Sequence, residues 1–248
     1  MNNTYQKAYS MVNANLNILL GSDMNGLVLL SAAGLGKTTL VFKAMETLKY
    51  RQGEHFSYFN SFFTPLAFFQ TLASTIELKK PKILILDDVE MILKDKNIIT
   101  LLKSATWENE KNRRVVNYTS TSVKVKETSI NFDGKIIILI NETPDSNPMF
   151  KAITDRMLFC ELSFSQKEIL DLMADEIIQK SYQNLDFGRR KMVLDFIKKN
   201  IQPNSDLSFR TLIKAYNFLL YSSNHWRELT ATLLKSSVKA VKQGNNLL

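Results

Sequence analysis

The amino-acid sequence predicts an α/β fold, with a three-layer core built on a parallel β-sheet and a small helical domain after it. Three observations support this prediction. Several short segments are continuously apolar, as in strands that are covered on both faces. These segments alternate with stretches of helical periodicity, which is typical of a three-layer arrangement. From Ser165 onward only helical periodicity remains, so we expect an α/β core over residues 1–164 and a helical domain over residues 165–248.

Five segments are predicted to form the strands, because each is short, apolar and free of strict alternation. They are residues 26–31, 56–59, 82–86, 135–140 and 157–162. Helices are predicted at residues 1–20, 37–50, 65–75 and 97–107. Thr64 and Pro65 favour the start of one of these helices, since threonine is a common N-cap and proline suits the first turn.

In the C-terminal domain, Ser165 and Glu168 have the spacing of a capping box, which predicts the start of a helix. Apolar residues at helical spacing predict two more helices, and a last helix is expected from about Trp226. The two apolar faces consist of Val193, Phe196, Ile197 and Ile201, and of Phe209, Leu212, Ile213, Tyr216 and Leu220.

A glycine-containing loop between the first strand and the next helix has the pattern of a phosphate-binding loop. The spacing matches the usual pattern G-x-x-x-x-G-K-[ST], and only Ser31 departs from it, since serine replaces the first glycine. Glycines let successive backbone N–H groups turn toward phosphate oxygens, and the helix N-terminus adds its dipole. Lys37 is expected to bind the β- and γ-phosphates, and the Thr38 hydroxyl to bind Mg²⁺. The predicted nucleotide-binding residues are Ala33, Gly34, Leu35, Gly36, Lys37, Thr38 and Thr39.

Two adjacent acids follow the apolar strand at residues 82–86. Asp87 is expected to hold Mg²⁺ through water, and Asp88 to orient or deprotonate the attacking water. Glu90 is an alternative for the second role, and the acid pair would otherwise serve only as a helix N-cap. The sequence contains no Asn-Lys-x-Asp string, which would favour guanine. The expected cofactors are therefore ATP and Mg²⁺.

The order of these motifs resembles that of the AAA+ ATPases, from about residue 20 to residue 222. The resemblance implies that Asn141 is the sensor-1 residue, that Arg156 is an arginine finger and that Arg210 is the sensor-2 arginine of a helical lid. Because an arginine finger acts on a neighbouring subunit, it also implies a homo-oligomer, either a ring or a helical array.

A narrower resemblance concerns residues 86–105, which look most like the small AAA+ ATPases of phages, plasmids and mobile elements. These proteins act in DNA replication or transposition, which implies a partner protein such as a helicase or a transposase. Asp88 departs from the family, where glutamate is commonest at this position, and the shorter side chain would slow turnover. Arg156 could instead form a salt bridge to Asp155 or Glu161 within its own chain. Arg210 could instead be an ordinary solvent-facing residue of a helix.

The net charge of +8 is concentrated near the C-terminus. Residues 188–248 contain 11 Lys/Arg and 3 Asp/Glu, whereas residues 1–187 contain 21 of each. This asymmetry favours a DNA-binding surface over residues 188–248, and the alternative is a solvated basic surface. Residues 111–126, rich in Val, Thr and Lys, predict an extended ribbon. The ribbon would either contact a nucleic-acid backbone or protect a sheet edge with lysines.

The sequence therefore predicts an oligomeric Mg-ATP-dependent AAA+ ATPase that acts on DNA or on a DNA-bound protein, in replication initiation, helicase loading or transposition. One alternative is a protein-remodelling motor with a pore loop at residues 61–64, and another is a nucleotide-gated scaffold that hydrolyses slowly. Cys160 is the only cysteine, the N-terminus does not resemble a signal peptide, and no apolar run is long enough to cross a membrane. We therefore expect a cytoplasmic protein without a membrane partner.

Overall fold

The computed structural model describes residues 3–60, 62–90, 92–108, 113–119, 128–143, 148–178, 180–203 and 205–236. The chain divides into two compact units. The sheet unit consists of the described residues within 8–32 and 36–163, and the helical unit of those within 1–7, 33–35 and 164–248. Residues 33–35, although they lie within the phosphate-binding loop, thus belong to the helical unit.

Five parallel strands form the main sheet, at the positions that the sequence predicts. They are β1 (Gly26–Ser31), β2 (Phe56–Phe59), β3 (Ile83–Asp87), β6 (Lys135–Ile140) and β7 (Leu158–Leu162). Their order is β2-β3-β6-β1-β7, and every neighbouring pair is parallel. The carboxyl ends of all five strands therefore lie at one edge of the sheet, with those of β3, β6 and β1 side by side.

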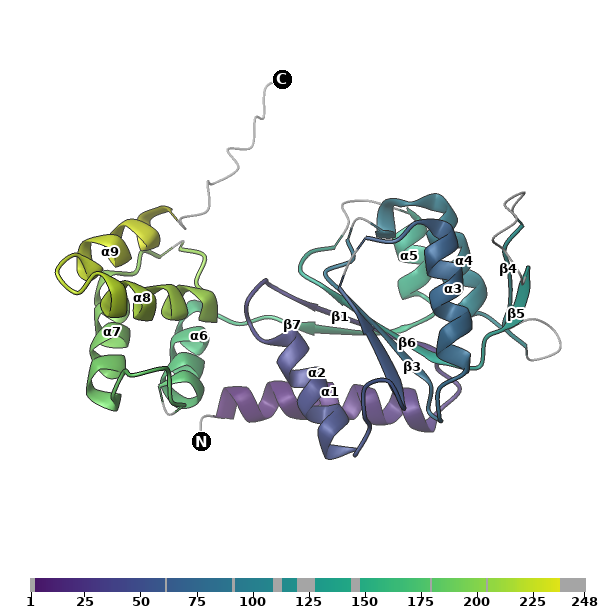
Figure 1. The fold of residues 1–248 in the computed structure, drawn as a ribbon, viewed down its shortest axis with the longest axis horizontal. Coiled ribbons are helices and arrows are strands. Elements are labelled where there is room, and N and C mark those ends of the chain that lie inside the picture. Colours follow the sequence, from purple (N-terminus) through teal and green to yellow (C-terminus); the bar gives the residue numbers. More distant parts are fainter. Residues whose placement is uncertain are drawn as a thin grey trace, which may run out of the picture. The chain divides into compact units, whose positions relative to one another are not determined.

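Helices cover both faces of this sheet, as the three-layer prediction requires (Figure 1). One face carries α3 (Pro65–Ile76), α4 (Lys96–Thr106) and α5 (Pro148–Thr154), and the other carries α1 (Asn3–Gly21) and α2 (Lys37–Thr47). All five residues of the central strand β3 are consequently buried, and its Leu84 and Ile85 are both fully inaccessible to solvent although they face opposite layers. This double coverage explains why the strand sequences lack polar alternation.

Short polar side chains fix where two of these helices begin. Thr64 accepts a hydrogen bond from the backbone N–H of Ala67 at 3.2 Å, so α3 starts at the predicted place. Asp95 accepts from the N–H groups of Asn97 and Ile98, which sets the start of α4 one residue before the predicted one. A single 3₁₀ turn (Ile92–Lys94) precedes that cap.

Two short strands outside the main sheet form an antiparallel hairpin stem. β4 (Val115–Asn117) pairs with β5 (Ser129–Asn131), and Val116 lies opposite Ile130 in the core. The extended ribbon predicted for residues 111–126 is thus found at residues 115–117, and its residues 111–112 and 120–126 lie outside the described part of the chain.

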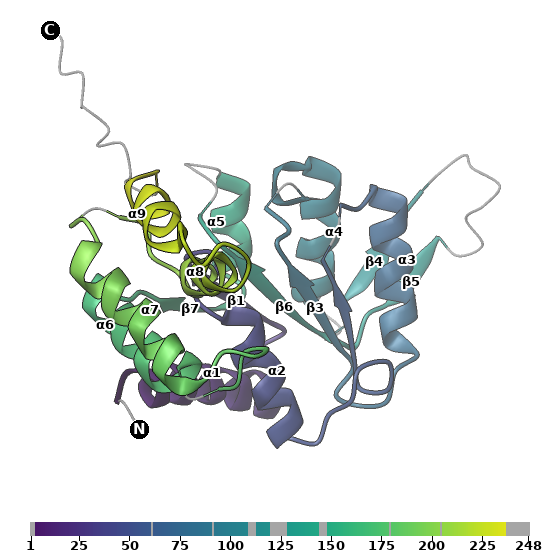
Figure 2. The ribbon, with the colours of Figure 1, turned by 60° about the vertical axis from the view of Figure 1, so that its left-hand side comes forward.

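The helical unit contains α6 (Gln166–Leu172), a π-helical turn (Met173–Ile177), α7 (Phe187–Asn200), α8 (Phe209–Tyr221) and α9 (Trp226–Ser236) (Figure 2). The predicted capping box is present, since the Ser165 backbone N–H donates to Glu168 at 2.8 Å and the Glu168 N–H donates to the Ser165 hydroxyl at 3.3 Å.

Leu212 and Tyr216 of α8 are fully buried, as predicted. The placement of Ile213 on this apolar face is wrong, because its side chain is 36% exposed.

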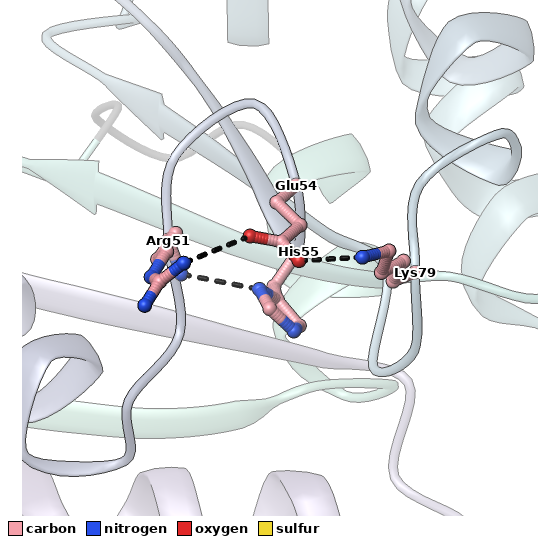
Figure 3. A network of polar contacts seen from close by, with 4 residues as sticks. All are labelled: Arg51, Glu54, His55 and Lys79. Atoms are coloured by element: carbon pink, nitrogen blue, oxygen red, sulfur yellow. Dashed lines mark hydrogen bonds and ion pairs between the residues drawn. The ribbon is translucent and has the colours of Figure 1, made fainter.

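A polar network holds the segment that leads into the edge strand β2. Glu54 lies between Arg51 and Lys79 (Figure 3), with its carboxylate 2.6 Å from the Lys79 ammonium and 3.8 Å from the Arg51 guanidinium. The hydrogen bond from Lys79 lowers the pKa of the Glu54 carboxyl. His55 accepts a hydrogen bond from the Arg51 backbone N–H at 3.2 Å. The network thereby joins the segment before β2 to the segment after α3.

Candidate active site

The candidate active site lies at the carboxyl edge of the sheet, where β1, β3 and β6 end. Because β6 lies between β3 and β1, the residues that follow these three strands become neighbours in space. The described sheet unit brings five predicted residues together here. They are Lys37, Thr38, Asp87, Asp88 and Asn141.

The loop between β1 and α2 depends on the backbone freedom of two glycines. Gly34 and Gly36 adopt φ values of 73° and 87°, a left-handed conformation that glycine reaches without strain. Gly36 is the N-cap of α2, and its lack of a side chain leaves the first N–H groups of the helix without a side-chain cap. Such a helix N-terminus attracts anions through its N–H groups and its dipole.

Lys37, the first residue of α2, is turned inward and is only 5% exposed. Its ammonium donates a hydrogen bond of 3.0 Å to the backbone carbonyl of Ser31 and one of 2.6 Å to Oδ1 of Asn141. The carbonyl of Ser31, rather than its side chain, thus contacts the lysine. The serine in place of the first glycine leaves this contact intact.

The Thr38 hydroxyl and the Asp87 carboxylate form a pair suited to a magnesium ion. Thr38 donates a hydrogen bond of 2.6 Å to Oδ2 of Asp87, which is 3% exposed at the end of β3. Tyr58, on the adjacent strand β2, donates a second hydrogen bond of 2.8 Å to the same oxygen. Burial and this hydrogen bond raise the pKa of Tyr58. No local pattern in the sequence points to Tyr58, because its contact depends on the pairing of β2 with β3.

Asn141, directly after β6, connects the lysine with two acids. Its side-chain amide donates to Oδ1 of Asp88 at 2.7 Å and to Oε1 of Glu90 at 3.0 Å. Its backbone N–H donates to the same Glu90 oxygen at 2.7 Å. Asp88 adopts a φ of 52°, a left-handed conformation that aspartate tolerates better than most residues. Glu90 therefore holds Asn141 by two hydrogen bonds, while Asp88 accepts only one from it.

Arg156 lies away from this cluster, just before β7 and hence at the amino edge of the sheet. Its guanidinium stacks over the ring of Trp107, with 4.8 Å between Cζ and the ring centroid, and its Nη1 donates to the carbonyl of Ala152. Within the described residues it does not form the alternative salt bridge to Asp155 or Glu161. In its own chain, Arg156 thus lies across the sheet from the phosphate-binding loop.

Arg210 belongs to the helical unit, so the cluster around Asn141 consists of sheet-unit residues alone. Arg210 lies exposed in the first turn of α8. Within the helical unit it lies beside Gly34, where an added Cβ would come within 3.2 Å of Arg210 Cγ. The Gly34 carbonyl accepts a hydrogen bond of 3.1 Å from the N–H of Phe209. Leu35 is buried in the core of the same unit, so only its backbone is available to a nucleotide.

The structure corrects part of the nucleic-acid prediction for residues 111–126. Arg114 is 7% exposed, and its Nη1 donates to the carbonyls of Ala105 and Gly134 at 2.9 and 2.7 Å. Burial lowers the pKa of this guanidinium. Tyr118 stacks against Phe69 of α3, with the ring centroids 5.5 Å apart. Both side chains therefore hold the hairpin stem to the core, and the buried Arg114 guanidinium is not free to contact a nucleic-acid backbone.

The basic side chains of the helical unit, by contrast, are mostly exposed. Arg190 is an exception at 8% exposure. Lys191 pairs with Asp195 at 2.8 Å, which reduces its availability to an anion. The exposed members in the described part of residues 188–248 are Arg189, Lys191, Lys198, Lys199, Arg210, Lys214, Arg227 and Lys235.

The residues at the carboxyl edge fit a magnesium-bound nucleoside triphosphate. Magnesium usually keeps several waters and binds one or two protein oxygens together with phosphate oxygens, and Thr38 and Asp87 supply such a pair. The described residues contain no group of three or more His, Cys, Asp or Glu that would enclose a metal without phosphates. No helix among them is long and apolar enough to cross a membrane.

Comparisons with known proteins agree with this architecture, although no protein-family model matches the chain. An uncharacterized 36.7 kDa protein from the nrdC–mobD intergenic region of Enterobacteria phage T4 is 21% identical over 243 residues, which cover 92% of this chain and 74% of the phage protein. Among solved structures, the Thermotoga maritima RuvB Holliday junction branch migration motor matches with a TM-score of 0.53 and 15% identity, over 94% of this chain and 68% of RuvB.

Domain III of the Thermotoga maritima replication initiation protein DnaA matches with a TM-score of 0.53 and 16% identity. The match covers 97% of this chain and 95% of the DnaA domain. At such low identity these likenesses establish the fold. The chain has the fold of the AAA+ P-loop ATPases, as its motifs predict.

Proposed function

We propose that this protein is a Mg²⁺-dependent ATPase that assembles into an oligomer and acts on DNA or on a DNA-bound protein. The observation that carries the proposal is the cluster of Lys37, Thr38, Asp87 and Asn141, joined by hydrogen bonds at the end of a glycine loop. A plain helix N-cap, the alternative role of the acids, would not require a buried lysine and a threonine hydroxyl at the same edge.

Each residue of the cluster has a distinct task in the proposed reaction. Mg-ATP supplies the phosphoanhydride bond that is broken and part of the charge neutralisation. Lys37 binds the terminal phosphates, while Thr38 and Asp87 hold the metal. Asp88 orients the attacking water and accepts its proton. Asn141, held by Glu90, aligns Asp88 with the phosphate end of the site.

The two arginines lie outside the carboxyl-edge cluster, and each has a separate role in the proposal. Since Arg156 lies at the opposite edge of its own sheet, we assign it to the nucleotide of a neighbouring copy, where its charge stabilises the transferred phosphoryl group. The helical domain predicted from the sequence, residues 165–248, acts as a lid in this proposal, and Arg210 senses the nucleotide state. Each active site then lies between two copies in a ring or helical array.

The exposed basic residues of α7, α8 and α9 support DNA as the partner. The names of the two solved relatives, a branch migration motor and a replication initiation protein, agree with this proposal. A helicase or a transposase is the partner protein expected for such an ATPase. If phosphates provide the contacts, DNA affinity will fall steeply as salt rises.

The test is ATP turnover with and without single- and double-stranded DNA, at several protein and salt concentrations. We expect turnover to require Mg²⁺ and to be lost in Lys37→Ala. Turnover per subunit should increase with protein concentration, because the site is completed by a second copy. The double variant Lys198→Ala/Lys199→Ala should weaken DNA binding, whereas Lys94→Ala/Lys96→Ala, which removes the same charge from the sheet unit, should not. DNA binding that is absent or independent of salt would contradict the DNA part of the proposal.

One observation favours a second candidate function, a motor that threads polypeptides. Phe62 follows β2 and is 71% exposed, whereas the neighbouring Phe63 is 5% exposed in the core. An exposed aromatic residue in this loop suits a pore that grips an extended chain. ATP turnover that is stimulated by unfolded protein instead of DNA, and that loses this stimulation in Phe62→Ala, would favour the second function.

A further inference from the structure

An exposed tryptophan lies against the arginine at the amino edge of the sheet. Trp107 is the C-cap residue of α4 and is 60% exposed, unusually open for so large an apolar side chain. Arg156 follows α5, and α5 packs against α4. The Arg156 guanidinium lies 4.8 Å from the centroid of the Trp107 ring. The ring therefore supports one face of the guanidinium and leaves much of its own surface open to solvent.

The other contacts of Arg156 leave its charge uncompensated. Its Nη1 donates to the neutral carbonyl of Ala152. Its Nε is buried and has no hydrogen-bond partner within the described part of the chain. No carboxylate in that part forms an ion pair with the guanidinium. An aromatic face and a neutral carbonyl orient a guanidinium without neutralising it. Arg156 is thus held in place while its charge remains available to an external anion.

We propose that Trp107 is a positioning residue for Arg156, which it holds in the orientation required to reach the nucleotide phosphates of a second copy of this chain. The inference rests on the proposed function, in which Arg156 acts between copies. The π face restricts the guanidinium before the second copy arrives, so less conformational freedom is lost when the site is completed. The open face of Trp107 then packs against that copy, in keeping with the enrichment of Trp and Arg at interface centres.

The proposal predicts that loss of Trp107 lowers turnover only when it affects the copy that donates the arginine. Oligomers mixed from two variants test this prediction directly. Asp87→Asn removes the metal carboxylate but retains Arg156, so this variant can only donate. Arg156→Ala retains the phosphate site but lacks the finger, so it can only accept. Each variant should be inactive alone, and mixing the two should restore turnover. Adding Trp107→Ala to the donor should lower the restored kcat by about tenfold to a hundredfold, with nucleotide affinity unchanged.

Two matched controls separate positioning from folding. Trp107→Phe in the donor keeps an aromatic face and should preserve most of the restored turnover. Trp107→Ala in the acceptor, beside Arg156→Ala, should leave restoration by an unmodified donor intact, because that copy contributes no arginine. The midpoint of thermal unfolding should be the same for the donors with and without the Trp107 substitutions, since Trp107 is largely exposed.

The outcomes distinguish a failure of the proposed function from a failure of the role of Trp107. If the unmodified donor and acceptor do not restore turnover when mixed, the assignment of Arg156 to a neighbouring copy is wrong and the role of Trp107 is overturned with it. If they restore turnover, and the Trp107→Ala donor restores it equally well, the proposed function remains and the positioning role of Trp107 is overturned alone.

Discussion

The ammonium of Lys37 donates a 2.6 Å hydrogen bond to the side-chain oxygen of Asn141, 104 positions later in the sequence. The same Asn141 donates its amide hydrogens to Asp88 and Glu90. One amide group thus connects the residue expected to bind phosphate with the acids expected to act on water.

Replacing Asn141 with Ala should reduce ATP turnover by about a hundredfold, because it removes the amide that aligns Asp88 in the proposed reaction. Nucleotide affinity should change little, since Lys37 retains its position through the Ser31 carbonyl. Steady-state kinetics and binding of a fluorescent nucleotide measure the two effects. Asn200→Ala, on the helical unit, is the control. Unchanged turnover in Asn141→Ala would remove Asn141 from the site.

Asp88→Asn should lower turnover by about 10²–10⁴-fold, since an amide cannot accept the proton of the attacking water. Asparagine also tolerates the left-handed backbone at this position, so the fold should be preserved. Glu90→Gln should have a smaller effect, because glutamine keeps an oxygen that accepts from Asn141. Single-turnover kinetics of both variants provide the comparison. A larger loss in Glu90→Gln would assign the base role to Glu90.

Tyr58→Phe should weaken the magnesium site while leaving the carboxylate of Asp87 in place. Its hydroxyl donates to the same oxygen as Thr38 and fixes the orientation of that carboxylate. We expect the Mg²⁺ concentration for half-maximal turnover to rise about tenfold, as is common when a group that orients a metal ligand is removed. Tyr221→Phe, at an exposed hydroxyl, is the matched control. Equal magnesium dependence in both variants would exclude a role for Tyr58.

Stability at high pH should depend on Tyr216, which is fully buried in the helical unit and whose pKa is raised by burial to about 12. The unfolded chain loses this proton near pH 10, whereas the folded chain keeps it. Unfolding therefore releases a proton between about pH 10 and 12, and the free energy of unfolding should fall by about 2–3 kcal/mol over that range. Denaturant titrations of Tyr216→Phe should show a smaller fall. An identical pH dependence would contradict the assignment.

The sequence was sufficient for the features that depend on local pattern. Continuous apolar runs identified β3 and β6, and the parallel arrangement that such runs require brings Asp87 and Asn141 to one edge. The capping pair of Ser165 and Glu168 likewise needs only neighbours along the chain. α5, in contrast, spans only Pro148–Thr154, and the sequence does not predict it because seven residues are too few to display a helical period.

Features that depend on tertiary contacts cannot be predicted from local sequence patterns. The role of Tyr58 follows from the register between β2 and β3, which no local pattern specifies. Arg114 has the composition of an exposed basic ribbon, yet two backbone carbonyls and burial make it structural. Ile213 fits the helical spacing of the apolar face of α8, but the buried stripe runs through Leu212 and Tyr216 instead.

The placement of Arg156 and Lys37 at opposite edges of one sheet has a consequence for assembly. If copies join through these residues, as proposed, they stack head to tail and every array has a direction. In an open array, one terminal subunit has an arginine that meets no nucleotide, and the subunit at the other end has a nucleotide that meets no arginine. Turnover at that second end should be slow, so an open array has one long-lived ATP-bound end, and a closed ring has none.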